Sequence, residues 1–229
     1  MMLGKAALAF WNGIQPGGDA EFLAWHVSEH IPERVGLPGF LRGRRYVANE
    51  VDVTRPRYFN FYETDTLDAL ESPVYRDRLD HPTPWTTKVV ATFTDTSRTM
   101  CRVAHTQGMG EGAWMQTIRV SFPAERDVCI DALIALLTNL PTRTPLVGAH
   151  LLDGVQRETK PTRELELRGR PDAQIDGVLL IEAADEATLA ALAREALSDE
   201  ALMKTGVRAL LRGTYRLEYS LIQHQRDMA

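Results

Sequence analysis

The residues best suited to chemistry lie together in one predicted helix near the start of the chain. Trp25, His26, Glu29 and His30 follow one another closely. Imidazole exchanges protons near neutral pH, so the two histidines are candidates for a general acid or base. At 100° per residue, His26 shares a stripe with Glu29, whereas His30 lies at the border of the apolar stripe. We predict His30 as the catalytic acid or base, with His26 in a supporting role.

Two other interpretations of the histidine pair remain open. Either histidine could be a hydrogen-bonded residue at the edge of the core with no chemical role. Two histidines at this spacing could also chelate a metal. A catalytic metal needs a third ligand, however, and none follows at a nearby spacing. We therefore expect no metal and no other cofactor at this site.

A basic stretch in the next predicted strand supplies candidates for holding an anion. When a base removes a proton, a negative charge develops on oxygen, and Arg42, Arg44 or Tyr46 could stabilise it. We predict these three residues as substrate-binding. The alternative is that Arg42, Arg44 and Arg45 form a solvated strand edge.

Aromatic side chains predict the wall of a binding pocket. In the strand predicted at 56–64, alternation places Tyr58, Asn60 and Tyr62 on one face. We expect that face to point into the interior, away from the helices, and Trp25 and Trp85 to complete the wall. The opposite face carries Phe59, Phe61 and Glu63. The alternative for each aromatic residue is an ordinary place in the core.

The order of predicted elements is the same in both parts of the chain, which divide near the glycines of 107–112. The first part has predicted strands at 5–11, 39–50, 56–64 and 98–106, and helices at 20–30, 66–79 and 82–93, the first capped by Asp19. The second has strands at 113–122, 146–158, 176–184 and 213–223, and helices at 125–140, 186–197 and 201–211. The charged segment 156–172 is interpreted as a solvated loop.

This order predicts an α+β protein built from two tandem ferredoxin-like (β-α-β-β-α-β) repeats, as domains 1–107 and 108–229. Each repeat would form its own antiparallel sheet with helices on one face. The bare faces would then pair to form a barrel, either within one chain or between two chains of a homodimer.

Composition limits the class of partner and places the site. The net charge is -5 and the pI is about 5.7, so we expect neither a nucleic acid nor a membrane as a partner. Cys101 and Cys129 are interpreted as reduced core thiols of a cytoplasmic protein. Residues 1–107 hold 13 of the 17 aromatic residues and four of the six histidines. We therefore assign the site to the first domain and interpret the second as mainly scaffold.

The first domain resembles the EthD-like proteins of the dimeric α/β-barrel superfamily. The resemblance rests on Trp25-His26-Val27-Ser28-Glu29-His30-Ile31-Pro32, on Leu37-Pro38-Gly39-Phe40 and on Arg44-Arg45-Tyr46. It implies a barrel with a ligand cleft between sheet and helices, and it matches His30 and Pro32 to the family's His-x-Pro motif. It also implies activities that range from decarboxylation or dehydration of aromatic polyketides to none. The fused second domain departs from the family pattern.

Together these observations predict a small-molecule site with a cofactor-independent lyase or dehydratase activity on an aromatic or polyketide-like compound. The alternative is a non-catalytic ligand-binding or assembly protein. The two differ in whether His26 and His30 face a water-accessible cavity or are sealed by Phe22 and Trp25. A third candidate is a metal- or haem-dependent oxygenase, but neither histidine of the second domain, His150 or His224, has a context that favours an axial ligand.

Overall fold

Strand pairing determines the architecture. The computed structural model describes residues 1–48, 56–123, 125–140, 145–156 and 161–226. Within these ranges, eight antiparallel strands form one closed barrel in the order β1-β3-β2-β8-β5-β7-β6-β4. The strands are β1 (Ala6–Ile14), β2 (Phe40–Ala48), β3 (Tyr58–Thr64), β4 (Phe93–Gly108), β5 (Trp114–Ser121), β6 (Leu146–Gly154), β7 (Gly177–Ala183) and β8 (Ala209–Ile222).

The expectation of two tandem ferredoxin-like repeats with separate sheets is wrong, although the α+β class holds. β4 pairs with β1 through residues 93–102 and with β6 through residues 101–108. β8 likewise pairs with β5 and then with β2. These two long strands therefore join both parts of the chain into one closed sheet within a single chain. Closure pairs the backbone N–H and C=O groups that the edges of two separate sheets would leave open.

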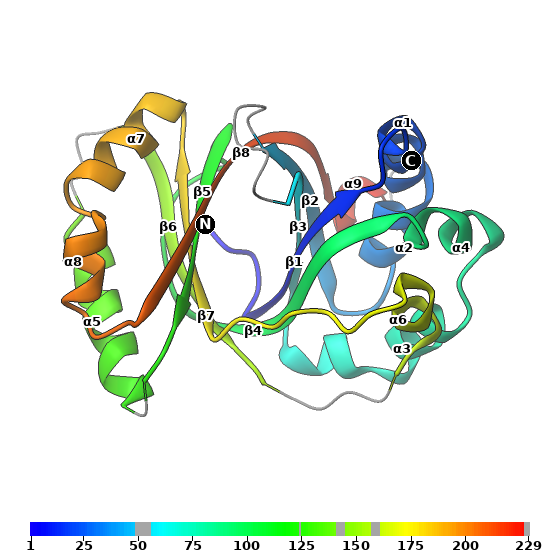
Figure 1. The fold of residues 1–229 in the computed structure, drawn as a ribbon, viewed down its shortest axis with the longest axis horizontal. Helices are drawn as coiled ribbons and strands as arrows, with labels where there is room; N and C mark the ends of the chain where they lie inside the picture. Colours follow the sequence, from blue (N-terminus) through cyan, green and yellow to red (C-terminus); the bar gives the residue numbers. More distant parts are fainter. Residues whose placement is uncertain (49–55, 124, 141–144, 157–160, 227–229) are drawn as a thin grey trace.

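Helices cover two opposite sides of the barrel (Figure 1). One side carries α5 (Arg126–Thr138), α7 (Glu186–Arg194) and α8 (Asp199–Met203). The other carries α1 (Asp19–Trp25), α2 (Ile31–Val35), α3 (Pro73–Asp80), α4 (Pro84–Val90), α6 (Arg163–Arg168) and α9 (Gln223–Arg226). The helix predicted at 66–79 is a 3₁₀ turn, η2 (Leu67–Glu71), followed by α3. Pro73 and Pro84 each begin a new helix, because a proline at the first helical position sacrifices no hydrogen bond.

Helix α6 belongs to the second part of the chain but lies on the side of the first. It follows β6 in sequence, yet it contacts α3 and α4 (Figure 1). The interpretation of 156–172 as a solvated loop is therefore wrong for residues 163–168, which form α6. Residues 169–171 are exposed and not helical, and residues 157–160 lie outside the described residues. The predicted strand at 39–50 ends at Ala48, and its last two residues also lie outside them.

The barrel interior is filled by an apolar cluster and an ion-pair network. The apolar cluster includes Met2, Trp11, Tyr46, Phe59, Phe61, Met115 and Tyr215. Beside it, the Arg44 guanidinium lies 3.1 Å from a carboxylate oxygen of Glu63 and 3.1 Å from one of Glu182. Since β2 and β7 are not neighbours in the barrel, the Arg44–Glu182 pair crosses the interior.

The orientation of β3 is the reverse of the predicted one. Phe59, Phe61 and Glu63 face the barrel interior, where they contact the apolar cluster and Arg44. Tyr58 and Tyr62 face the helices instead, since their hydroxyls bond to side chains of the helical segment 19–35. All seven positions of β3 are buried. Alternation therefore defines two faces without showing which of them lines the interior.

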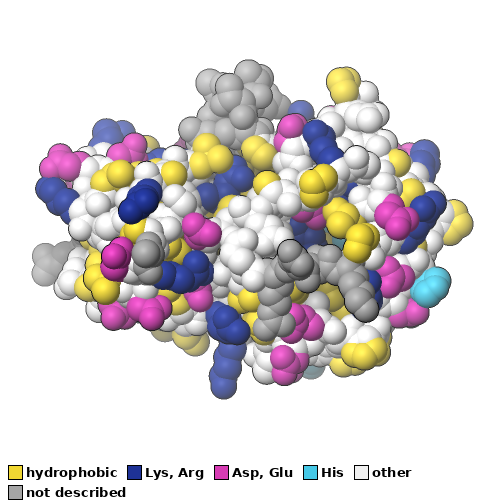
Figure 2. Space-filling model, turned by 60° about the horizontal axis from the view of Figure 1, so that its bottom comes forward, with side chains coloured by type: hydrophobic (Ala, Val, Ile, Leu, Met, Phe, Trp, Pro, Cys, Tyr) yellow, Lys and Arg dark blue, Asp and Glu magenta, His cyan; other side chains and the backbone are white. Residues whose placement is uncertain are grey.

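The surface carries charges of both signs. Acidic and basic side chains are interspersed over the face shown in Figure 2, and neither sign gathers into one field. None of the helices in the described ranges has the length and apolar character needed to cross a membrane.

Candidate active site

The helix that carries the two histidines contains a π-turn. α1 and α2 are joined without a break by η1 (His26–His30), in which the backbone N–H of Ile31 donates to the carbonyl of His26, five residues earlier. Pro32 comes next. In a regular α-helix its ring would clash with the carbonyl four residues before it, and a wider turn relieves that clash. The turn also changes the 100° spacing and separates the environments of His26 and His30.

His26 is sealed in the protein and both ring nitrogens are engaged. The Arg45 guanidinium donates to Nδ1 at 3.4 Å. Nε2 must then carry the proton, and it donates to the Tyr62 hydroxyl at 3.1 Å. The ring stacks on Phe22 with 5.0 Å between centroids. Burial above all, then the charges of Arg45 and Arg34, hold the pKa of His26 well below its usual range.

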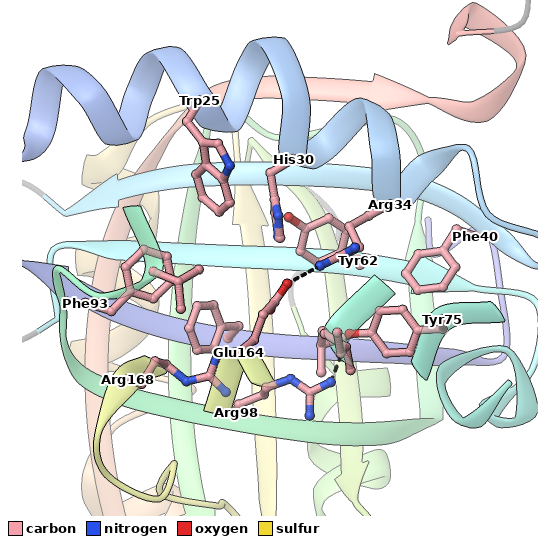
Figure 3. Close-up of a pocket in the computed structure, with 14 residues that line it drawn as sticks. Trp25, His30, Arg34, Phe40, Tyr62, Tyr75, Phe93, Arg98, Glu164 and Arg168 are labelled. Atoms are coloured by element: carbon pink, nitrogen blue, oxygen red, sulfur yellow. Dashed lines mark hydrogen bonds and ion pairs between the residues drawn. The ribbon is translucent and has the colours of Figure 1, made fainter. Parts of the chain in front are cut away.

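His30 has a different environment. Its ring lies 4.2 Å from the Trp25 ring and points into a cavity (Figure 3). Nδ1 is buried and has no hydrogen-bond partner among the described residues. Burial, followed by the charge of Arg34, holds the pKa of His30 well below its usual range. The imidazole is therefore neutral at pH 7 and keeps a free nitrogen lone pair.

The cavity lies between the outer face of the barrel and the helices. The cavity volume is about 30 Å³, so the cavity is narrow. Aromatic rings form much of its wall. They are Phe10 on β1, Trp25 on α1, Phe40 on β2, Tyr62 on β3, Tyr75 on α3 and Phe93 on β4.

Charged residues that the sequence analysis missed line the same cavity. Arg34, Arg98, Glu164 and Arg168 come from α2, β4 and α6 (Figure 3). Arg34 lies 2.5 Å from the Glu164 carboxylate, and both side chains are buried. Arg98 shares its strand face with Thr96, Met100 and Arg102, so alternation in the sequence does not single it out. Glu164 and Arg168 could not be placed without the tertiary position of α6.

The structure does not bring the predicted anion-holding residues to His30. Arg42, Arg44 and Tyr46 point into the barrel, so the sheet separates them from the cavity. Arg42 donates to Glu63 and Glu111. The alternative interpretation of Arg42, Arg44 and Arg45 as a solvated strand edge is wrong, because all three are buried. Arg45 faces the helices and bonds to His26 and Glu218.

The predicted wall residues are divided between the cavity and its surroundings. Trp25 and Tyr62 line the cavity. The Tyr58 hydroxyl donates to Asp19 at 2.7 Å. Asp19, predicted to cap the first helix, is instead the first residue of α1, and no side-chain hydrogen bond caps that helix. Asn60 donates to the Asn12 side chain at 2.7 Å. Trp85 lies on α4, away from the cavity, and donates to Glu21 at 2.9 Å.

Comparisons with known proteins show the fold. No protein-family model and no curated protein matches the chain. An anthrone oxidase-like protein matches with a TM-score of 0.67 at 15% identity, over 96% of this chain and 94% of that one. A proposed monooxygenase of Lactobacillus acidophilus NCFM matches with 0.57 at 10% identity, over 96% and 97% of the two chains. A chlorite dismutase variant from Candidatus Nitrospira defluvii matches with 0.56 at 11% identity, over 93% and 92%.

Among the described residues, no three side chains of His, Cys, Asp or Glu gather in a way that could hold a metal ion. His150 is fully buried, with Nδ1 2.8 Å from the Thr106 hydroxyl and Nε2 3.3 Å from the Glu182 carboxylate. Nε2 makes no hydrogen bond of normal geometry to the described residues, although the Glu182 carboxylate lies close to it.

Proposed function

We propose that the cavity binds a small aromatic or polyketide-like molecule, and that the protein acts on it as a cofactor-independent lyase or dehydratase. The observation that carries this proposal is His30, which combines a place in the cavity wall, a lowered pKa and an unpaired buried nitrogen. A neutral imidazole of this kind can accept a proton from a bound molecule at pH 7.

The chemistry follows from the groups around His30. The imidazole takes a proton from a carbon next to a carbonyl group, and hydrogen-bond donors of the cavity wall stabilise the enolate that forms. In a dehydration, the enolate expels the hydroxyl group on the adjacent carbon, which takes the proton back from His30 and leaves as water. His26 does not touch the cavity. Through its hydrogen bond it positions Tyr62, a residue of the cavity wall.

Two resemblances support this class of substrate. The His-x-Pro motif of the EthD-like proteins falls on His30 and Pro32, and the cavity lies where that resemblance implies a cleft, between sheet and helices. One protein that shares the fold is described as anthrone oxidase-like, and anthrone is a fused aromatic ketone.

The competing hypothesis is a non-catalytic ligand-binding protein. The narrowness of the cavity and the sealed position of His26 favour it. The two hypotheses differ in whether His30 transfers a proton to and from a bound molecule.

Deuterium exchange tests this difference directly. The probe is 2-tetralone, a bicyclic aromatic ketone with acidic C–H groups beside its carbonyl, incubated with the protein in deuterated water at pH 7 and followed by NMR. We expect the wild type to accelerate the exchange and His30→Gln to lose at least about 100-fold of that acceleration, the usual contribution of a general base. Binding without acceleration would favour the non-catalytic hypothesis.

Two variants control this experiment. His81→Gln makes the same chemical change at an exposed position and should exchange like the wild type. His30→Gln should unfold at the wild-type temperature, because no described residue forms a hydrogen bond with the buried Nδ1 of His30. His26→Gln should instead lose roughly 1–3 kcal/mol of stability, because it disturbs two bonded partners.

A further inference from the structure

Arg98 differs from the other arginines of the cavity in its partners. The Arg34 guanidinium is neutralised by Glu164 at 2.5 Å and Glu33 at 2.9 Å. The Arg168 guanidinium is neutralised by Asp172 at 2.8 Å. Arg98 donates one hydrogen bond, 2.9 Å long, to the neutral hydroxyl of Tyr75. No carboxylate of the described residues lies within 4.0 Å of it.

Arg98 is half-buried, and despite this burial Tyr75, Asp172 and Glu164 raise its pKa, so the guanidinium is charged although no carboxylate of the described residues pairs with it directly. Its side chain leaves β4 opposite Phe10 and enters the cavity among aromatic rings (Figure 3). A charged guanidinium with unused N–H groups forms its strongest hydrogen bonds with an anion. Tyr75 occupies one terminal nitrogen, so the remaining N–H donors are open to a group in the cavity. A planar guanidinium matches the two oxygens of a carboxylate best.

We propose that Arg98 binds a carboxylate of the substrate, so that the site selects aromatic carboxylic acids in their ionised form. This proposal rests on the proposed function, because it assigns the substrate class of the same cavity. It places the carboxylate against Arg98, on β4, and the ring among the aromatic residues below His30. The carboxylate of Glu164 does not compete for Arg98, because it is held by Arg34.

The test compares two probes of the same shape by isothermal titration calorimetry at pH 7. One is 2-naphthoate, an anion, and the other is 2-acetylnaphthalene, its neutral methyl ketone. We expect the wild type to bind 2-naphthoate at least about tenfold more tightly, the effect of one charged hydrogen bond. Arg98→Met should abolish this preference and leave the affinity for the ketone within about twofold, because it keeps an apolar stem of similar length.

Two further variants make the result specific. Arg98→Lys keeps the charge without the planar fork and should retain part of the preference. Arg102→Met changes an exposed arginine of the same strand and should retain all of it. Equal wild-type affinities for the two probes, or an Arg98→Met variant that folds and still prefers 2-naphthoate, would overturn this proposal and leave the proposed function standing. If the wild type binds neither probe, both proposals fail.

Discussion

Two histidines four positions apart have opposite environments in this protein. His26 is enclosed by Phe22, Tyr62 and Arg45, and its nitrogens are bonded. His30 lines the cavity, and its Nδ1 has no partner in the described part of the chain. The folded state holds both rings neutral, mainly because burial disfavours the charged form. This makes His30 a proton acceptor, and it links the stability of the fold to pH.

The sign of that linkage is definite. In the unfolded chain a histidine takes up a proton near pH 6.5, whereas in the folded protein the lowered pKa of His30 means that protonation needs a lower pH. The unfolded state therefore gains protons first, and stability is lost as the pH falls below about 6.5, by up to about 1.4 kcal/mol per pH unit for each ring. We expect His30→Gln to lose less stability than the wild type between pH 7.5 and 5.5 in urea unfolding. Equal losses would show that His30 does not titrate in this way.

At the scale of elements, the site depends on a π-turn and on one displaced helix. The turn at His26–His30 directs His26 into the protein and His30 towards the cavity. Helix α6 comes from the connection between β6 and β7, yet it closes the cavity formed by the first part of the chain. The buried pair of Arg34 and Glu164 holds α6 against α2.

That pair can be tested by a double-mutant cycle in urea. Arg34→Met leaves the Glu164 carboxylate buried without its partner and should cost about 3–5 kcal/mol. Adding Glu164→Leu removes the unpaired buried carboxylate and should recover much of the lost stability. Arg163→Ala, in the exposed pair with Glu166 on the same helix, should change stability by no more than about 0.5 kcal/mol. Additive effects of the two buried substitutions would contradict the contact.

At the scale of the whole molecule, the wall of the barrel separates an ion-pair network inside it from the polar contacts of His26 outside it. Two consecutive residues of β2 belong to these two regions. Arg44 points into the barrel, between Glu63 and Glu182, whereas Arg45 points outwards to His26. Despite the cost of burial, the charge of Arg44 and the contact with His150 hold the pKa of Glu182 well below its usual range. Glu182 is therefore ionised, and its ion pair with Arg44 ties strands from both parts of the chain together.

Removing the centre of this network should destabilise the whole barrel. Arg44→Met leaves the buried Glu182 carboxylate without its guanidinium, whereas Glu63 keeps Arg42. We expect a loss of about 3–5 kcal/mol in a single unfolding transition seen alike by circular dichroism and tryptophan fluorescence. The same change at the exposed Arg216 of β8 should have little effect. Two separate transitions in the wild type would show that the two parts of the chain fold independently. That result would contradict the pairing of all eight strands in one barrel.

The sequence by itself determined most of the strands and helices, α6 excepted, and which residues of a strand share a face. Periodicity predicted the order of strands and main helices and placed His30 at the border of the apolar stripe, since these properties depend on neighbouring residues. The predicted α+β class also holds, and the neighbours of known structure share its fold.

Only the tertiary structure decided how those elements meet. Both faces of β3 are buried, so alternation could not show that Tyr62 faces the helices and Phe61 the interior. The pairing of β4 with β6 and of β8 with β2 replaced two sheets by one barrel, and the docking of α6 brought Glu164 to Arg34. These contacts join residues far apart in the chain. Their energy depends on which surfaces are left unpaired after the local elements form, and no local pattern contains that information.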